Sequence, residues 1–267
     1  MPFAKANNKN LFYTINRPVD SAKTVIIFIH GLGSSSCFYQ TVIPNLDADI
    51  CAIALDTCGS GLSKLACSEQ TIETIREDVI SLLDTLEIQE RIIIVGHSMG
   101  GIIASSVAAS HPERVKGVVL IGPVNPSTAM SEVFKKRIQV VQKDGLEALA
   151  ATVPTAATGK ASTSLHHAFI RTLILATSPE GYSSLCKVIA TAKQLDYQAI
   201  TVPLLVLAGE NDNTAPLSGC QTILDLYGSS AEKKTIEVLP CVGHWHCVEE
   251  PGLVTEHIQK FVRGVST

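Results

Sequence analysis

Short apolar runs alternate with segments of helical periodicity along most of the chain. Six runs consist mainly of isoleucine, valine and leucine with little polar alternation, which is typical of strands buried on both faces of a parallel sheet. They occupy residues 25–29, 51–55, 92–95, 118–121, 204–208 and 235–238. A hairpin of residues 3–6 and 11–15, turning at Asn7 and Asn8, is predicted to precede them. The pattern therefore predicts an α/β fold with a mostly parallel sheet.

Residues 69–86 have the spacing of an amphipathic helix, and further helices are expected after Ser98 and after His244. Residues 127–197 interrupt the alternation because they contain no convincing strand. Their helical segments are 132–142, 146–150, 165–175 and 182–192, with breaks at Pro126, Pro154 and Pro179. We interpret them as a helical cap inserted between two strands of a core formed by residues 1–126 and 198–267. Since loops at the carboxyl ends of parallel strands surround the ligand crevice, this cap is expected to roof it.

The composition is that of a chain with a large buried core. Hydrophobic residues make up 46% of the 267 residues and charged residues 17%, which suits one α/β domain with an insertion. Basic residues are scattered apart from Lys135-Lys136-Arg137, so no nucleic-acid partner is expected at a net charge of −4. No apolar run reaches the roughly 18 residues of a membrane span. The first residues lack a signal-peptide core and the eight cysteines are irregularly spaced, so we expect free thiols in a cytoplasmic protein.

The strongest chemical signal is Gly-His-Ser-Met-Gly-Gly at residues 96–101, between a predicted strand and a helix rich in small residues. A Gly-x-Ser-x-Gly in this context is typical of a nucleophile elbow, in which Ser98 projects from a sharp turn. Glycines are needed because the residues two before and two after the serine nearly touch. The alternative is a purely structural glycine-rich turn. We predict that Ser98 is a nucleophile, and a serine hydroxyl needs a base.

Among the eight histidines, the candidates for that base are His30, His244 and His246. His244 is favoured because it follows the last predicted strand, at the same edge of the sheet as Ser98. Asp212, which follows the strand at 204–208, is predicted to hold the imidazole in the right tautomer, whereas Glu210 is interpreted as structural. The chain order is then nucleophile, acid and base: Ser98, Asp212 and His244.

Two backbone N–H groups are predicted to form an oxyanion hole. One belongs to Met99, directly after the nucleophile, and the other to Leu32 in the loop His-Gly-Leu-Gly at residues 30–33. The side chain of His30 is expected to support this loop. Residues 56–63 contain Gly-Ser-Gly but complete neither a dinucleotide motif nor a Walker motif, so they are interpreted as a rigid turn beside the crevice. No cofactor is expected.

Together these motifs resemble the α/β-hydrolase superfamily over nearly the whole chain. The resemblance is to the 3-oxoadipate enol-lactonase-like esterases and lactonases, in size, in Val-Pro-Leu at residues 202–204, and in Gly243-His244 followed by Glu250-Pro251. It implies an eight-stranded, mostly parallel sheet with the cap between strands six and seven. It also implies hydrolysis of a carboxylic ester or lactone through an acyl-enzyme, because epoxide hydrolases and haloalkane dehalogenases of this fold place an aspartate at the elbow. A monomer or homodimer is expected.

The helical segments of the cap are largely apolar, so a small and largely apolar substrate is expected. Gly31 and His97, beside the oxyanion loop and the nucleophile, are assigned to the substrate site, although the His97 side chain is expected to point away from the serine. In the cap, Arg171, His166 and His167 are the candidates for binding a polar or carboxylate end of the substrate. The alternative for these three is a solvated helix face.

Three alternatives accompany this prediction. Cys241, His244, His246 and Cys247 form a ligand set that zinc could use, although their spacing is compressed for a zinc finger. A ligand receptor built on the same scaffold, with little turnover, is the second. The third stays within enzymes, since the same triad supports perhydrolysis, carbon–carbon bond cleavage and thioester hydrolysis.

Overall fold

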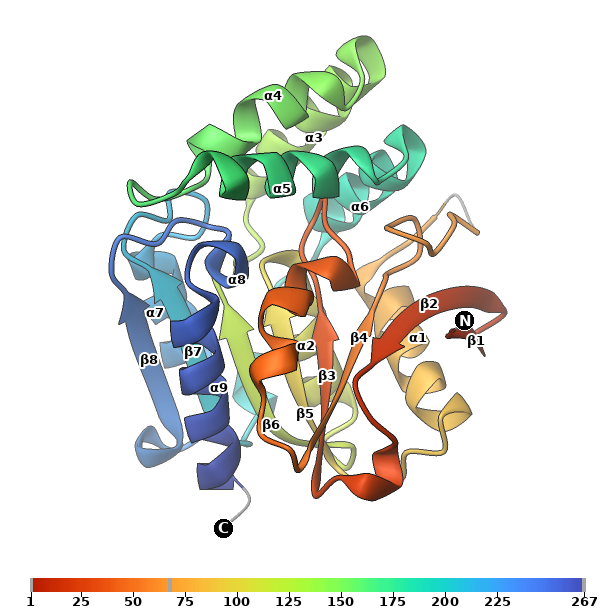
Figure 1. The fold of residues 1–267 in the computed structure, drawn as a ribbon, viewed down its shortest axis with the longest axis vertical. Coiled ribbons are helices and arrows are strands. Elements are labelled where there is room, and N and C mark those ends of the chain that lie inside the picture. The colour runs from red at the N-terminus through yellow and green to blue at the C-terminus, as the bar shows by residue number, and fades with distance from the viewer. Residues whose placement is uncertain (1, 67–68, 266–267) are drawn as a thin grey trace.

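Residues 2–66 and 69–265 are described by the computed structural model, in which eight strands form a sheet with the order β1-β2-β4-β3-β5-β6-β7-β8 (Figure 1). The strands are β1 (Phe3–Ala6), β2 (Lys9–Ile15), β3 (Thr24–Ile29), β4 (Ile50–Leu55), β5 (Ile92–His97), β6 (Val115–Ile121), β7 (Leu204–Gly209) and β8 (Lys234–Leu239). β1 and β2 pair in antiparallel orientation, as do β2 and β4, and the other neighbours are parallel. Each predicted strand is confirmed and is extended by three residues at most at either end.

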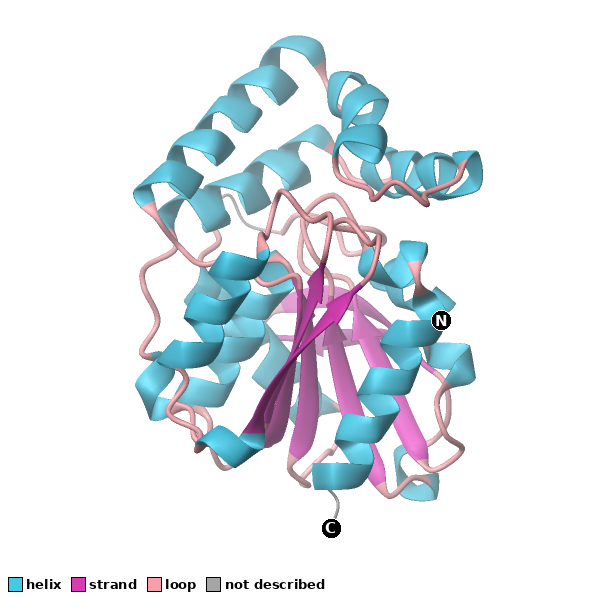
Figure 2. Ribbon diagram, turned by 90° about the vertical axis from the view of Figure 1, so that its left-hand side faces the viewer, coloured by secondary structure: helices cyan, strands magenta, loops and turns pink. Residues whose placement is uncertain are grey.

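The central strands are buried on both faces, as their uniform apolar sequence predicts. Every residue of β3, β4, β5 and β7 is buried. On one face of the sheet pack α1 (Ile72–Thr85), α2 (Met99–Ser110) and α7 (Leu217–Leu226), and on the other lie α8 (His246–Glu249) and α9 (Pro251–Val265) (Figures 1 and 2). Short 3₁₀ helices occur at Val19–Ser21, Ser36–Thr41, Ile43–Asn45, Tyr197–Ala199 and Ala231–Lys233. These layers leave the carboxyl edge of the parallel strands to be covered by other segments.

Four helices between β6 and β7 cover that edge, and we call this layer the cap (Figures 1 and 2). They are α3 (Thr128–Asp144), α4 (Glu147–Ala156), α5 (Ser164–Leu175) and α6 (Pro179–Thr191). α3 packs against α6, and α4 packs against α5. The predicted break at Pro154 is wrong, because this proline lies inside α4. The helix ends two residues later, so the proline removes one N–H donor from the last turn and the helix tolerates it.

Within the part of the chain that the structure describes, no helix combines the length and the apolar character needed to cross a bilayer.

Candidate active site

Ser98 occupies a sharp turn between β5 and α2. Its backbone has φ 53° and ψ −116°, a conformation that residues with a side chain rarely adopt. A Cβ atom at Gly96 would lie 2.2 Å from the carbonyl oxygen of Gly100, and one at Gly100 would lie 2.1 Å from the carbonyl oxygen of Ile29. Both positions therefore require glycine, and the turn has the geometry of a nucleophile elbow.

A buried histidine–carboxylate pair lies on two loops that follow β7 and β8. Nδ1 of His244 is 2.8 Å from Oδ2 of Asp212, and the Asp212 side chain is fully buried. Oδ1 of Asp212 accepts hydrogen bonds of 2.8 Å from the backbone N–H groups of Thr214 and Ala215. Burial on its own raises the pKa of Asp212, but the electrostatic attraction of His244 and His246 and the hydrogen bonds from His244 and Ala215 outweigh burial and lower that pKa well below its ordinary value. Asp212 is therefore an ionised acceptor facing His244.

His246 and His30, the other candidate bases, serve as supports. Nδ1 of His246 is 3.0 Å from the carbonyl oxygen of His244, and its ring is fully buried. Nδ1 of His30 is 2.7 Å from the carbonyl oxygen of Gly31, and Nε2 of His30 accepts a hydrogen bond from the backbone N–H of Thr57 at 3.1 Å. His30 therefore ties its own loop to the turn at residues 56–63.

His97 lies behind the nucleophile and not in a cavity wall. Its Nε2 is 2.8 Å from the carbonyl oxygen of His244, and its ring stacks on Phe38 with centroids 4.5 Å apart. Burial, together with the rings of His244 and His246, lowers the pKa of His97 well below its ordinary value, so the neutral ring donates to that carbonyl. A Cβ atom at Gly31 would lie only 2.7 Å from Nδ1 of His97. The structure thus gives Gly31 and His97 packing contacts and places neither among the residues that line the cavity at Ser98.

That cavity has a volume of about 140 Å³ and lies under the cap. The core contributes Leu32, Ser98, Thr214, His244 and Trp245 to its wall, and the cap contributes Phe134, Arg137, Val153, Ala156, Ala157, Ile174 and Tyr182. Ser98 and His244 therefore line one cavity, together with the predicted oxyanion residue Leu32. Met99, the first residue of α2, is buried and is not among the residues that line this cavity.

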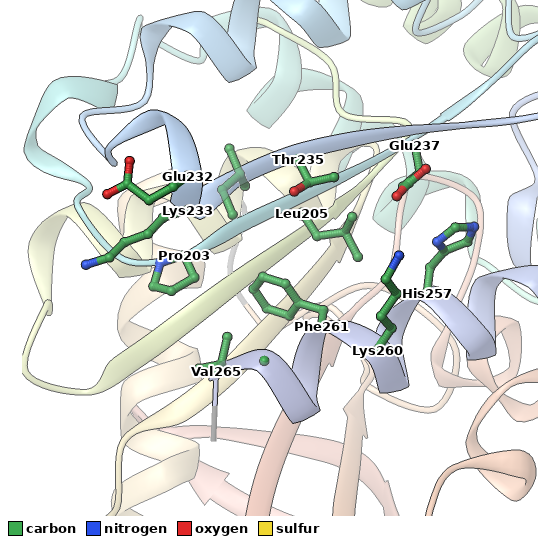
Figure 3. Close-up of a pocket in the computed structure, with 12 residues that line it drawn as sticks. Pro203, Leu205, Glu232, Lys233, Thr235, Glu237, His257, Lys260, Phe261 and Val265 are labelled. Carbon is green, nitrogen blue, oxygen red and sulfur yellow. The ribbon is translucent and has the colours of Figure 1, made fainter. Parts of the chain in front are cut away.

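A larger cavity, of about 270 Å³, lies between β7, β8 and α9 (Figure 3). Its wall includes Phe261 and the polar side chains Glu237, His257 and Lys260. It shares no lining residue with the cavity at Ser98. Size alone would therefore favour this larger cavity, whereas the strained serine and the histidine–carboxylate pair make the cavity at Ser98 the candidate active site.

The cap brings a different arginine to the cavity from the one the sequence suggested. The guanidinium of Arg171 pairs with the carboxylate of Glu147 at 2.6 Å on the outside of the cap. Arg137 of α3 instead lines the cavity, where it contacts the ring of Phe134 at 5.3 Å and the side chain of Tyr182. Arg137 was not predicted from the sequence, because it is the last residue of a basic run that was considered only as a source of positive charge. Its spacing of three residues from the apolar Phe134 could have indicated that both side chains lie on the same face of the helix.

The two cap histidines make local contacts. Nδ1 of His166 accepts a hydrogen bond from the backbone N–H of Thr163 at the start of α5. Nε2 of His167 lies 3.1 Å from Oγ1 of Thr158. Neither histidine lines the cavity at Ser98.

The cysteine–histidine cluster near His244 gains no support as a zinc site. Across residues 2–66 and 69–265, no group of three histidine, cysteine or acidic side chains is arranged to hold a metal ion. Cys241 is exposed, whereas Cys247 is buried, and burial raises the pKa of the Cys247 thiol well above its ordinary value. Both are free thiols.

Comparison with known proteins agrees with the fold. A family model described as serine aminopeptidase, S33 (Hydrolase_4) matches residues 20–251. RutD of Variovorax paradoxus strain S110, provisionally named a carbamate hydrolase, is 27% identical over 96% of this chain and 97% of its own length. The enol-lactonase of Burkholderia xenovorans LB400 superposes with a TM-score of 0.87 at 26% identity, covering 98% of this chain and 100% of the enol-lactonase.

A thermophilic esterase from Thermogutta terrifontis shares the fold, with a TM-score of 0.89 at 21% identity over 100% of this chain and 99% of its own. The predicted superfamily and the resemblance to enol-lactonases and esterases are confirmed. The chain belongs to the serine aminopeptidase S33 family of hydrolases, within the α/β-hydrolase superfamily.

Proposed function

We propose that the protein hydrolyses a small carboxylic ester or lactone, with Ser98 as nucleophile, His244 as base and Asp212 as the acid that orients it. The observation that carries the proposal is the 2.8 Å contact between Asp212 and His244 beside a cavity that His244 shares with Ser98. The ionised Asp212 holds the Nδ1–H tautomer of His244, which leaves Nε2 free to act as a base.

The reaction proceeds in two acyl-transfer steps. Nε2 of His244 takes the hydroxyl proton of Ser98 as Oγ attacks the carbonyl carbon, and the tetrahedral intermediate then expels the alcohol oxygen, which receives that proton. In a lactone this oxygen stays attached to the acyl chain. A water that gives its proton to His244 next attacks the acyl carbon, and Ser98 leaves with the proton while the carboxylic acid is released.

The backbone N–H groups of Leu32 and Met99 are the proposed oxyanion donors. Within the described residues, neither N–H donates a hydrogen bond, although Leu32 is half-buried and Met99 buried. Unsatisfied donors are costly inside a protein unless a ligand or water completes them. Met99 directly follows Ser98, and Leu32 follows Gly31, where an added Cβ atom would lie 3.1 Å from Cβ of Ser98, so both free donors belong to segments next to the serine and support a site for a developing negative charge.

The size and lining of the cavity favour a small substrate. Its volume of about 140 Å³ lies below the roughly 300 Å³ at which pockets for drug-sized ligands begin. Phe134, Val153 and Ile174 supply apolar wall, and Arg137 supplies one cation. We therefore propose a short acyl chain that carries an acidic group toward Arg137.

The relatives suggest which carbonyl compounds to test. Enol-lactone hydrolysis is the activity named for the Burkholderia xenovorans protein, which favours a lactone. The name of RutD favours a carbamate as a second candidate substrate, which the same serine chemistry can attack at its carbonyl carbon.

A serine-directed probe tests the proposal. The protein is treated with a fluorophosphonate, the modified residue is identified by mass spectrometry, and turnover of p-nitrophenyl esters, simple lactones and carbamates is measured. We expect labelling at Ser98, and we expect Ser98→Ala to reduce turnover on the order of 10⁴-fold or more. The exposed Ser218→Ala in α7 is the matched control and should behave as wild type. Labelling of another residue, or more than about a tenth of wild-type turnover in Ser98→Ala, would refute the assignment.

A further inference from the structure

Glu249 is a buried carboxylate held entirely by neutral donors. Its Oε1 accepts a hydrogen bond from the backbone N–H of Trp245 at 2.9 Å. Its Oε2 accepts from the N–H of Gly243 at 2.9 Å, the N–H of Gly159 at 2.6 Å and the hydroxyl of Ser162 at 3.0 Å. Among the described residues, no lysine, arginine or histidine forms an ion pair with it. Four hydrogen bonds therefore compensate the burial of this charge.

Two of these donors flank the proposed base. Gly243 and Trp245 precede and follow His244, and both N–H groups point to the one carboxylate. The N–H of His244 itself donates to the carbonyl oxygen of Ala157 at 2.7 Å. Three consecutive peptide groups around His244 are thus fixed, two by Glu249 and one by the cap.

The other two donors belong to the cap. Gly159 and Ser162 lie in the segment that joins α4 to α5. This segment, residues 157–162, touches the loop of residues 241–245 backbone to backbone. A Cβ atom at Gly159 would lie 1.8 Å from the carbonyl oxygen of Cys241, and one at Gly243 would lie 2.5 Å from the carbonyl carbon of Thr158. Glu249, which is 90 residues from Gly159 in the chain, therefore bridges the cap segment and the loop of residues 241–245.

We infer that Glu249 is a positioning residue that locks the base to the cap. It acts through the backbone of His244, so that Nε2 meets Ser98 only while the cap segment 157–162 is seated. The inference rests on the proposed roles of Ser98 and His244. A displacement of the order of 1 Å in a reacting group can cost about 10²-fold in rate, so a loose histidine loop should slow the chemical step more than it weakens substrate binding, because Phe134, Arg137 and Ile174 line the cavity from outside both segments.

Glu249→Gln is the sharpest test because it preserves size. An amide has only one acceptor oxygen, and its NH₂ group cannot accept a hydrogen bond from an N–H group. If the NH₂ group replaces Oε1, the hydrogen bond from Trp245 is lost, and if it replaces Oε2, the hydrogen bond from Gly159 is lost. We expect kcat for a neutral p-nitrophenyl ester to fall about 10–100-fold with a smaller change in KM, and fluorophosphonate labelling of Ser98 to slow in parallel. Amide hydrogen exchange should accelerate at residues 157–162 and 241–245 and stay unchanged in the central strands.

Glu250→Gln is the matched control, because Glu250 is the next residue and its carboxylate makes no hydrogen bond or ion pair within the described chain. If Glu249→Gln fails to fold, Ser162→Ala can be used instead, because it removes only one cap donor. It should give a smaller decrease in kcat and a smaller acceleration of amide exchange in the same two segments. Unchanged kcat, a loss equal to that of Glu250→Gln, or faster exchange spread over the whole sheet would each overturn the inference. Wild-type protein that is not labelled at Ser98 would instead refute the proposed function, and the exchange measurement would still report whether Glu249 joins the two segments.

Discussion

At the scale of single residues, hydrogen bonds from nearby backbone N–H groups fix the orientation of the Asp212 side chain. One carboxylate oxygen accepts from the N–H groups of Thr214 and Ala215, so the other oxygen has one orientation left, toward His244. The local sequence Asp-Asn-Thr-Ala-Pro makes this turn, since aspartate side chains readily accept from N–H groups two and three residues later. The position after β7 and the chain order made Asp212 predictable. The contacts of Gly31 and Arg171 were not predictable in this way, because they depend on neighbours that are remote in sequence, whereas the His97 side chain was expected to point away from the serine.

The lowered pKa of Asp212 makes a prediction about acid stability. A carboxyl group whose pKa is lower in the folded protein stabilises the fold above its unfolded pKa, about 3.9, and this stabilisation is lost as the pH falls toward the folded value. The free energy of unfolding of the wild type should therefore decrease relative to that of Asp212→Asn between about pH 5 and pH 3. Urea denaturation followed by the single tryptophan, Trp245, measures it.

Asp20→Asn, at an exposed position, is the control for this titration and should show a smaller pH-dependent difference from wild type. A difference between wild type and Asp212→Asn that stays constant, or that grows in favour of the wild type as the pH falls, contradicts the lowered pKa.

At the scale of elements, the elbow depends on close contact among three of them. β5 ends at the nucleophile, α2 begins directly after it, and Gly100 lets the first turn of α2 lie against the carbonyl oxygen of Ile29 at the end of β3. The strand–turn–helix order could be predicted from the apolar run and the small residues that follow Ser98. The contact with β3 could not, because it depends on the strand order, in which β3 and β5 are neighbours.

Gly100→Ala should be strongly destabilising. The new Cβ atom would lie 2.1 Å from a backbone oxygen that cannot move without shifting β3, so we expect a loss of about 1–3 kcal/mol in the free energy of unfolding. Gly219→Ala, in the first turn of α7 with no heavy atom within 4 Å of the added methyl, is the matched control and should keep its stability or gain up to about 1 kcal/mol. Equal free energies of unfolding of the two variants in urea would contradict this prediction, because they would show that the turn and β3 can accommodate the added methyl group at little cost.

At the scale of the whole molecule, the cap and the core each supply part of one cavity. The core provides Ser98 and His244, whereas the cap provides most of the apolar wall and the cation of Arg137. Arg137 is half-buried, and the ion pairs of arginines in the described chain involve Arg76, Arg114, Arg171 and Arg263 instead. Burial raises the pKa of Tyr182 to about 12, so the hydroxyl beside Arg137 stays protonated and does not neutralise it. This leaves the guanidinium available to an anionic substrate group.

Arg137→Gln should therefore separate acidic from neutral substrates. For the monomethyl ester of succinic acid we expect kcat/KM to fall about 10–100-fold, as for the loss of a charge-assisted hydrogen bond, while methyl butanoate is turned over nearly unchanged. Arg171→Gln is the matched control, because this cap arginine pairs with Glu147 on the outside. Equal losses on both esters, or an equal effect of Arg171→Gln, would place the determinant of specificity elsewhere.

The sequence by itself determined the α/β class, the strands and the helical cap, because local periodicity indicates each of them. It also determined the order of Ser98, Asp212 and His244, because each of these residues lies in a short motif beside the end of a strand. Only the tertiary structure decided which side chains face the cavity. It turned His97 toward the carbonyl oxygen of His244, turned Arg171 outward and brought Arg137 inward. It also brought Glu249 between the histidine loop and the cap. These outcomes depend on how helices pack across the sheet edge, and such long-range contacts leave no periodic signal in the chain.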